Sequence, residues 1–141
     1  MARRLFTSGT NALIDFLASL DLRAALVTSG YTFAVADDAL NDVGGANIIA
    51  SGADLTLSRI AAPNGAALDV ANFSFPSVPA GSTIDGVIIY QEGATDADRV
   101  LWGYIDEDSS AVAISVPTNG NNVNVTIPAA GLLALTDSNA P

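Results

Sequence analysis

The chain contains no histidine, no cysteine and no lysine. These residue types supply most general bases, nucleophiles and soft metal ligands, so most kinds of catalytic site are excluded. Without cysteine there are no disulfides, thiolate metal sites or cysteine nucleophiles. A Walker A loop needs lysine, and no histidine is present to activate a serine. Carboxylate chemistry is what remains.

Positive charge is also scarce, because fifteen carboxylates face five arginines and the formal net charge is −10. Binding to nucleic acid or to anionic lipid requires several basic side chains. Arg3 and Arg4 form the one basic pair of the sequence, and two charges are too few for a nucleic-acid footprint. We therefore expect no nucleic acid and no membrane among the partners.

Long apolar runs are missing as well. No stretch approaches the ~18 apolar residues of a membrane span. The region after Arg4 contains Asn11 and Asp15, which interrupt the apolar stretch that an export signal requires. We expect a soluble protein that is made in a cytoplasm.

Apolar periodicity predicts one helix near the start. An apolar face predicts an amphipathic helix over residues 10–20, with Thr10 or Asn11 as N-cap. The residues that recur at three- and four-residue spacing are Leu13, Ile14, Phe16, Leu17 and Leu20. Residues 31–43 are ambiguous. A second short helix is possible there around Ala34, Val35, Ala39 and Leu40, and it would end at Gly44-Gly45.

The rest of the sequence has β patterning. Turn residues separate apolar stretches at short intervals, which is typical of a sandwich or barrel. Residues 86–90 are apolar throughout and predict a central strand covered on both faces. We expect a mainly β, antiparallel β-sandwich or barrel-like single domain over residues 11–141, with an arm over residues 1–10. The predicted strands cover residues 22–27, 47–50, 54–60, 67–75, 84–91, 99–106, 112–116, 123–127 and 132–135.

Asn64-Gly65 and Asn119-Gly120 are hairpin-turn dipeptides. We interpret both as residues that fix strand register. In residues 123–127, apolar and polar side chains alternate, so this strand is predicted to have one wet and one dry face.

Carboxylates gather around two places, residues 37–42 and residues 96–108. Asp96, Asp98 and Glu107 match three ligand positions of a calcium loop, but Val100 and Leu101 stand where an oxygen ligand and a glycine are needed. We predict no metal and no cofactor, with a single surface Ca²⁺ on either side of this strand as the alternative.

Aromatic residues are few: one Trp, three Tyr and five Phe. Trp102 and Tyr104 are two positions apart on a predicted strand and so share one face. We interpret them as part of the core, since both types are mostly buried. The alternative is a small exposed ledge, such as a sugar-binding site uses.

A series of short motifs follows in order along the chain. It starts with residues 21–33 (DLRAALVTSGYTF) and the acidic stretch 37–43 (DDALNDV), and continues through residues 55–57, 73–75, 80–83, 86–90, 101–106 and 117–120. Over residues 11–127, the order and spacing of these motifs resemble a family of small virion proteins of tailed phages. Members of that family often carry lysine-containing stretches near the start, where this chain has Arg3 and Arg4.

The resemblance implies a head decoration or head-fibre-like role and implies no catalytic residues. We expect a non-enzymatic capsid decoration protein of the virion that binds the outer surface of the head and stabilises it. Its expected partners are the major capsid protein, other copies of itself, or both, in a homo-oligomer such as a trimer. The alternatives are a tail or head–tail connector component and a carbohydrate-binding or adhesion module.

Four residues at the start of the chain are the predicted protein-interaction residues. Arg3, Arg4, Leu5 and Phe6 precede the predicted helix and lie outside the predicted β domain. We predict that this arm docks on a neighbouring copy or on the capsid protein. A disordered tail is the alternative.

Overall fold

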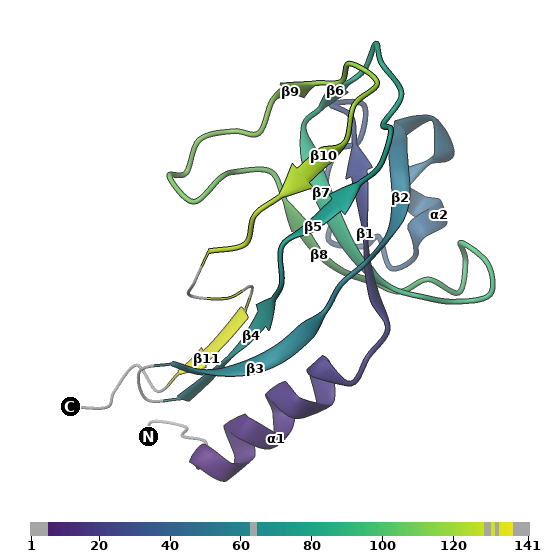
Figure 1. Cartoon of the computed structure of the whole chain (residues 1–141). Helices are drawn as coiled ribbons and strands as arrows, with labels where there is room; N and C mark the ends of the chain where they lie inside the picture. Colours follow the sequence, from purple (N-terminus) through teal and green to yellow (C-terminus); the bar gives the residue numbers. More distant parts are fainter. Residues whose placement is uncertain (1–5, 63–64, 129–130, 132, 137–141) are drawn as a thin grey trace. The chain divides into compact units, whose positions relative to one another are not determined.

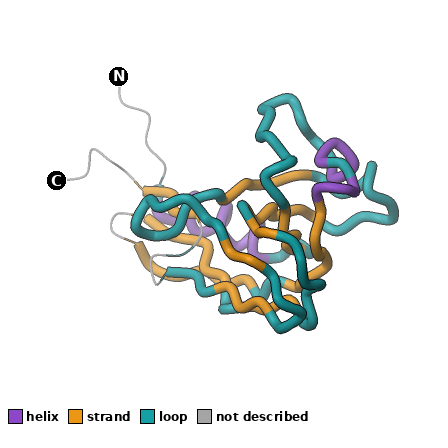
Figure 2. The backbone as a smooth tube through the Cα atoms, turned by 90° about the horizontal axis from the view of Figure 1, so that it is seen from above, coloured by secondary structure: helices purple, strands orange, loops and turns teal. Residues whose placement is uncertain are grey.

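The computed structural model describes residues 6–62, 65–128, 131 and 133–136. Over this part the fold is mainly β, every strand pairing is antiparallel, and helix α1 (Thr7–Ala18) is the principal helix. Figure 2 shows how little of the backbone is helical, with the helices purple and the strands orange. The fold class predicted from the sequence is confirmed.

The chain forms two compact units, and each combines segments that are distant in the sequence. Unit 1 comprises Met1–Leu20, Thr56–Asn72 and Thr126–Pro141, and unit 2 comprises Asp21–Leu55 and Phe73–Val125. The division of the sequence into an arm over residues 1–10 and a β domain over residues 11–141 stays a prediction. None of the helices in the described ranges has the length and apolarity that crossing a bilayer requires.

Unit 1 is a three-stranded sheet with α1 packed against it (Figure 1). The strand order is β11 (Leu133–Thr136), β4 (Gly65–Val70), β3 (Leu57–Ala62). Its core joins Ile14 of α1 to Ala66 and Leu68 of β4. Arg59 of β3 donates a hydrogen bond from Nε to Asp15 Oδ1 of α1 at 2.8 Å.

Helix α1 begins three residues earlier than the sequence predicts, inside the predicted arm. The expected caps Thr10 and Asn11 are wrong, because Phe6 is the N-cap and makes no side-chain capping bond. Thr10 lies inside the helix, buried, and its hydroxyl donates to Thr7 O at 2.9 Å. This internal bond satisfies the hydroxyl, so Thr10 is free to sit on the packed face.

Unit 2 is built on a four-stranded sheet in the order β2 (Ile48–Asp54), β1 (Leu22–Val27), β7 (Gly86–Gln91), β8 (Leu101–Ile105). Residues on both faces of β1 and β7 are buried, as predicted for residues 86–90. On one face, the main core cluster of the unit packs against short helix α2 (Leu40–Val43) and the loop before it. The cluster consists of Ala25, Val27, Tyr31, Leu40, Val43, Ile88 and Tyr90.

Two small sheets complete unit 2. One pairs β5 (Phe73–Phe75) with β10 (Val123–Val125), and the other pairs β6 (Thr83–Ile84) with β9 (Val116–Pro117). Strand β5 also lies against β2. The expected alternation in residues 123–127 is confirmed, since Asn124 and Thr126 are exposed while the residues between and beside them are half-buried.

Three predicted strands are interrupted in the structure. Residues 67–75 are divided between β4 and β5, residues 54–60 between the end of β2 and the start of β3, and residues 84–91 between β6 and β7. At each break, a backbone amide forms a hydrogen bond with a residue outside the predicted strand. One example is the Asp85 amide, which donates to Val27 O at 2.9 Å. Strand-like sequence lies on both sides of each break, so the pattern alone does not reveal where one strand ends and the next begins.

Two further predictions concern connecting segments. Residues 112–116 are not a strand, because Val112 is exposed and only Val116 enters a strand. Asn119-Gly120 is not a hairpin turn, because β9 and β10 belong to different sheets. β3 and β4 do pair, with Ala62 opposite Gly65, while Asn64 and its neighbour Pro63 lie outside the described residues.

The expected helix in residues 31–43 is shorter than the pattern allows. It covers Leu40–Val43 and ends at Gly44, which has a φ of +81°. Ala34 and Val35 lie in the preceding loop, and Val35 is exposed. A left-handed φ of this kind favours glycine, so the predicted stop at Gly44-Gly45 is confirmed.

Candidate functional site

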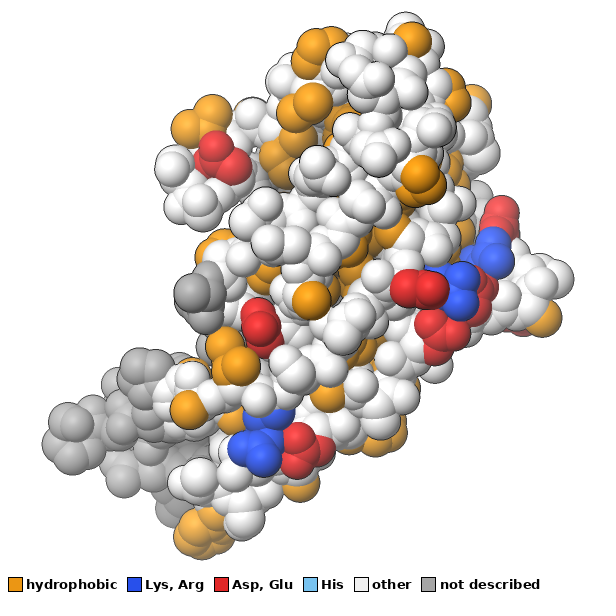
Figure 3. Space-filling model, viewed as in Figure 1, with side chains coloured by type: hydrophobic (Ala, Val, Ile, Leu, Met, Phe, Trp, Pro, Cys, Tyr) orange, Lys and Arg blue, Asp and Glu red, His pale blue; other side chains and the backbone are white. Residues whose placement is uncertain are grey.

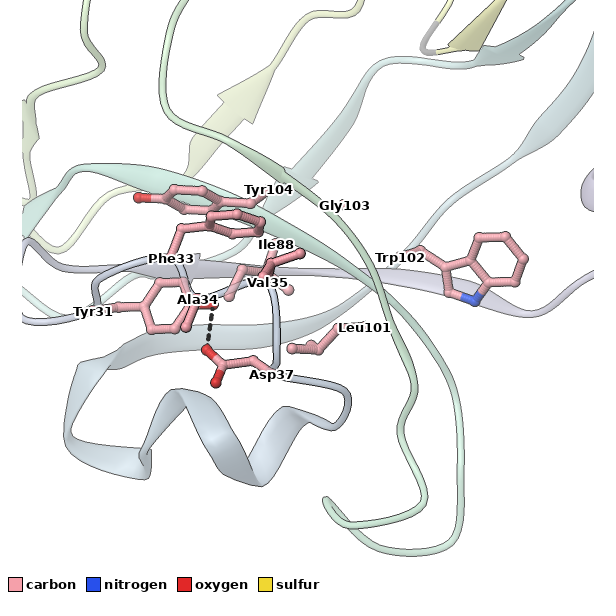
Figure 4. Close-up of a pocket in the computed structure, with 10 residues that line it drawn as sticks. All are labelled: Tyr31, Phe33, Ala34, Val35, Asp37, Ile88, Leu101, Trp102, Gly103 and Tyr104. Atoms are coloured by element: carbon pink, nitrogen blue, oxygen red, sulfur yellow. Dashed lines mark hydrogen bonds between the residues drawn. The ribbon is translucent and has the colours of Figure 1, made fainter. Parts of the chain in front are cut away.

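A small, open pocket in unit 2 is the candidate functional site. Its volume is about 110 Å³, and the loop after β1 and strand β8 supply most of its walls. We call it the aromatic pocket (Figure 4). It is lined by Tyr31, Phe33, Ala34, Val35, Asp37, Ile88, Leu101, Trp102, Gly103 and Tyr104.

Three aromatic rings form the ordered part of this pocket. The Tyr31 and Tyr104 rings meet edge to face, with centroids 5.4 Å apart. The Phe33 ring lies parallel to the Tyr104 ring, at 6.0 Å between centroids and an interplanar angle of 3°. Both are favourable arrangements for aromatic pairs. The cluster holds Phe33 in place although 58% of that residue is exposed.

The position of Tyr104 depends on a residue of the neighbouring strand. Tyr104 pairs with Ile88 of β7, and its ring extends over Gly86. A Cβ atom at position 86 would lie 2.5 Å from Tyr104 Cε2, closer than real Cβ contacts allow. Glycine at this position therefore lets the Tyr104 ring lie against the sheet.

The loop that carries Phe33 is held at both ends. The Tyr31 hydroxyl donates to Asp37 Oδ2 at 3.0 Å. Asp42 Oδ2 accepts from the backbone amides of Asp38 and Ala39, each at 3.1 Å. These two bonds hold the pKa of Asp42 below its usual value, because they stabilise the ionised carboxylate. A backbone bond from the Leu101 amide to Asp38 O, at 3.0 Å, then ties the loop to β8.

The pocket is polar at one point, and the charge there is negative. Burial and the bond to Asp37 raise the pKa of Tyr31 to about 12. Burial, and then the negative charges of Asp106 and Asp85, also raise the pKa of Tyr104. Among the described residues, no Lys or Arg side chain lines the pocket. The pocket therefore combines aromatic faces with uncompensated carboxylate charge.

The two aromatic residues singled out from the sequence have different positions. Tyr104 is partly buried against the main core cluster, as predicted. Trp102 is 46% exposed, so the expectation that it belongs to the core is wrong. The register of β7 and β8 shifts here, with Tyr90 opposite Leu101 and Ile89 opposite Gly103. Trp102 is therefore the extra residue of a bulge, and its indole points away from Tyr104 (Figure 4).

Of the predicted interaction residues, Arg3, Arg4 and Leu5 lie outside the described residues. Phe6 is described and is 87% exposed. Leu13 and Phe16, on the outer side of α1, are exposed too. Phe6 and Leu13 are seven residues apart and Phe16 follows three residues later, a spacing that places the two helix residues on the same side. Unit 1 therefore has exposed apolar side chains, one of which, Phe6, belongs to the predicted arm.

The acidic residues around β8 serve local structure. Asp96 is paired with Arg99 at 2.5 Å, and Asp98 accepts from the Thr95 hydroxyl at 2.7 Å. Asp108 Oδ1 accepts from the amides of Ser110 and Val112, at 2.8 and 3.0 Å. Within the described part of the chain, no group of three or more His, Cys, Asp or Glu residues is placed to hold a metal ion.

The arginines of the described part are all paired with carboxylates. Glu92 lies between two of them, at 3.1 Å from Arg23 Nε and 2.5 Å from Arg99 Nε. The hydrogen bond from Arg99 is the main reason that the pKa of Glu92 is lowered. Arg59 pairs with Asp15. Figure 3 shows the visible blue guanidinium groups lying against red carboxylates.

Comparisons with known proteins add no relative, since no family model, no curated protein and no solved structure matches this chain.

Proposed function

We propose that this chain is a non-enzymatic structural protein of a tailed-phage particle, a capsid decoration protein that binds the outer surface of the head and stabilises it. The observation that supports the proposal best is exposed apolar surface in both units. Phe33 and Val35 are 58% and 92% exposed, and Phe6 and Phe16 are exposed beside the arm. Large exposed apolar side chains in contiguous groups mark protein interaction sites.

The charge of the chain fits this role. A net charge of −10 favours solubility of the free chain. On a shell with many equivalent sites, weak single contacts are sufficient because each subunit makes several of them. The resemblance of residues 11–127 to small phage virion proteins supports the same proposal.

The test uses particles of a phage whose genome encodes this chain, produced after that gene has been deleted. Purified full-length chain added to such particles should bind to saturation at symmetry-related sites on the head, visible in an electron-microscopy map. The loaded heads should retain their DNA at higher temperature than the unloaded ones. Binding at the tail would support a tail or connector role, and no binding at all would contradict both.

Two variants make this test specific. Phe33→Ser with Val35→Ser removes exposed apolar surface at the aromatic pocket, whereas Val112→Ser removes a similarly exposed apolar residue elsewhere in unit 2. We expect the first variant to lose at least tenfold in affinity for the heads and the second to bind like the wild type.

The aromatic pocket also favours a second candidate, a carbohydrate-binding module. Such modules use exposed aromatic faces and a few polar groups, and Phe33, Trp102 and Asp37 provide these here. A glycan array probed with the full chain tests this candidate. A saturable sugar ligand whose binding is lost in Trp102→Ala would support it, and an empty array would remove it.

A further inference from the structure

The aromatic pocket has the chemistry of a site for a cationic side chain. Phe33, which is 58% exposed, and the Asp37 carboxylate both line the pocket, and among the described residues no basic side chain lines it. A guanidinium group stacks on aromatic faces and pairs with carboxylates through the same planar group. Asp37 keeps one oxygen that accepts no hydrogen bond from the Tyr31 hydroxyl, so a guest cation can bond to it.

The electrostatic surroundings favour the same guest. Asp85 and Asp106 are close enough to affect the ionisation of Tyr104 on the opposite wall. A neutral guest, such as a sugar or an apolar peptide, would bury part of Asp37 without compensating its charge, which is unfavourable. A cation removes that cost, so charge complementarity distinguishes the guests.

The chain itself contains a segment that fits. Arg23, Arg59 and Arg99 are already paired with carboxylates. The other two arginines of the sequence, Arg3 and Arg4, are adjacent and are followed by Leu5 and Phe6. A basic pair next to two apolar residues complements a pocket with carboxylate and aromatic walls.

We propose that the aromatic pocket of one copy receives the Arg3-Arg4 segment of another copy, with a guanidinium against Phe33 and paired with Asp37. This inference goes beyond the proposed function, because it names a contact between copies of this chain that would build the expected homo-oligomer. The proposed contact also limits the distance between the donor's helix start and the acceptor's pocket. Arg3 is three positions before Phe6, and an extended chain covers about 3.5 Å per residue. The Phe6 residue of the donor must therefore lie within roughly 10 Å of the acceptor's pocket, plus the length of the arginine side chain.

The test is complementation between two full-length variants. The arm variant carries Arg3→Glu and Arg4→Glu. The pocket variant carries Phe33→Ser and Asp37→Asn, where the asparagine oxygen still accepts from Tyr31. Each variant alone should associate at least tenfold more weakly than the wild type in analytical ultracentrifugation. An equimolar mixture should form a 1:1 complex, because it combines one intact arm with one intact pocket.

Controls keep this result interpretable. Val112→Ser with Asp69→Asn removes the same kinds of group from other places and should associate like the wild type. Circular dichroism and a urea midpoint for each variant establish that it is folded. If the mixture does not associate, if either variant alone associates like the wild type, or if the wild type is monomeric at all concentrations, the arm–pocket contact is disproved.

A peptide supplies an independent measurement. Labelled MARRLFTSG, the first nine residues, should bind the full-length arm variant in fluorescence anisotropy, and raising the salt concentration should weaken this binding. The matched peptide MAEELFTSG should not bind. Equal binding of both peptides, or tighter binding at high salt, would show that an apolar guest occupies the pocket instead.

The outcomes separate this inference from the proposed function. If the wild-type chain loads onto heads but the mixture of arm and pocket variants does not associate, the arm–pocket contact is overturned and the decoration role stands. Complementation between the two variants without any binding to heads would support the arm–pocket contact and contradict the decoration role.

Discussion

The pKa of the Tyr31 hydroxyl reflects its burial and its hydrogen bond within the aromatic pocket. Burial and the bond to Asp37 raise its pKa to about 12, and the pKa values of Tyr90 and Tyr104 are raised as well, mainly by burial. In the unfolded chain all three would ionise near pH 10. The stability due to these shifts is complete below pH 10 and is lost as the pH rises through the higher folded values.

We therefore expect an ultraviolet titration of the native protein to show less than half of the tyrosinate absorbance at pH 10, with the last step near pH 12. In Asp37→Asn, the last step should move to lower pH but stay above 10, because the charge is lost while burial remains. A native curve that matches the urea-unfolded chain would contradict the burial of these hydroxyls.

The lowered pKa of Glu92 predicts a pH dependence of stability opposite to that of the tyrosines. Its pKa is lowered, chiefly by the hydrogen bond from Arg99. The pairing therefore stabilises the fold above the unfolded pKa of 4.5 and is lost as the pH falls through the lower folded value. Glu92→Gln should lower the free energy of unfolding by about 0.5–1 kcal/mol at pH 7, since the pair is partly exposed.

Urea unfolding at pH 7 and at pH 3 measures this difference. The gap between wild type and Glu92→Gln should narrow between pH 7 and pH 3, because the stabilisation is lost as the wild-type carboxyl takes up its proton. Asp69→Asn serves as the control, because no ion pair or side-chain hydrogen bond involves Asp69 in the described residues. A gap that persists unchanged at pH 3 would show that charge is not the cause.

At the scale of elements, α1 depends on one buried contact. Ile14 is fully buried against Ala66 and Leu68, while its neighbour Leu13 is 47% exposed. Ile14→Ala should lower the free energy of unfolding by about 2–4 kcal/mol through lost burial and the resulting cavity. Leu13→Ala should change it by less than about 0.5 kcal/mol. Urea denaturation followed by circular dichroism compares the two, and equal effects would mean that α1 packs by a different face.

The local sequence pattern predicts whether most segments are helix or strand, but it does not predict the residues at which they begin and end. The strand over residues 22–27 and the buried strand within residues 86–90 follow from apolar runs bounded by turn residues. The breaks at Asp85 and at Ala71 depend on backbone bonds to residues distant in the sequence, such as the bond from Ala71 N to Thr56 O. No local pattern carries that information.

The candidate site was predictable only in part, for the same reason. Trp102 and Tyr104 were identified as a pair, but the bulge in β8 separates them. Phe33 and Asp37 were not connected with Tyr104, although the structure brings all three together. The available signal was an aromatic residue in a loop between two β-type stretches, where a side chain has no core position to fill.

For the whole molecule, net charge is the dominant property. With a charge of −10, carboxylates repel one another across the folded chain, and salt screens this repulsion. We expect the midpoint of thermal unfolding at pH 7 to rise by several degrees between low and moderate sodium chloride concentrations. Scanning calorimetry at several salt concentrations checks this. A midpoint that falls with salt would mean that the ion pairs of Arg23, Arg59 and Arg99 outweigh the repulsion.

The order of segments in unit 1 has a consequence for biosynthesis. Its sheet places β4 between β3 and β11, and β11 follows all the other strands in the chain. While the ribosome is still translating the segment before Leu133, one edge of β4 has no strand to pair with. An open edge of this kind can recruit a strand from another nascent polypeptide. Chaperone demand during synthesis should therefore end when β11 leaves the exit tunnel.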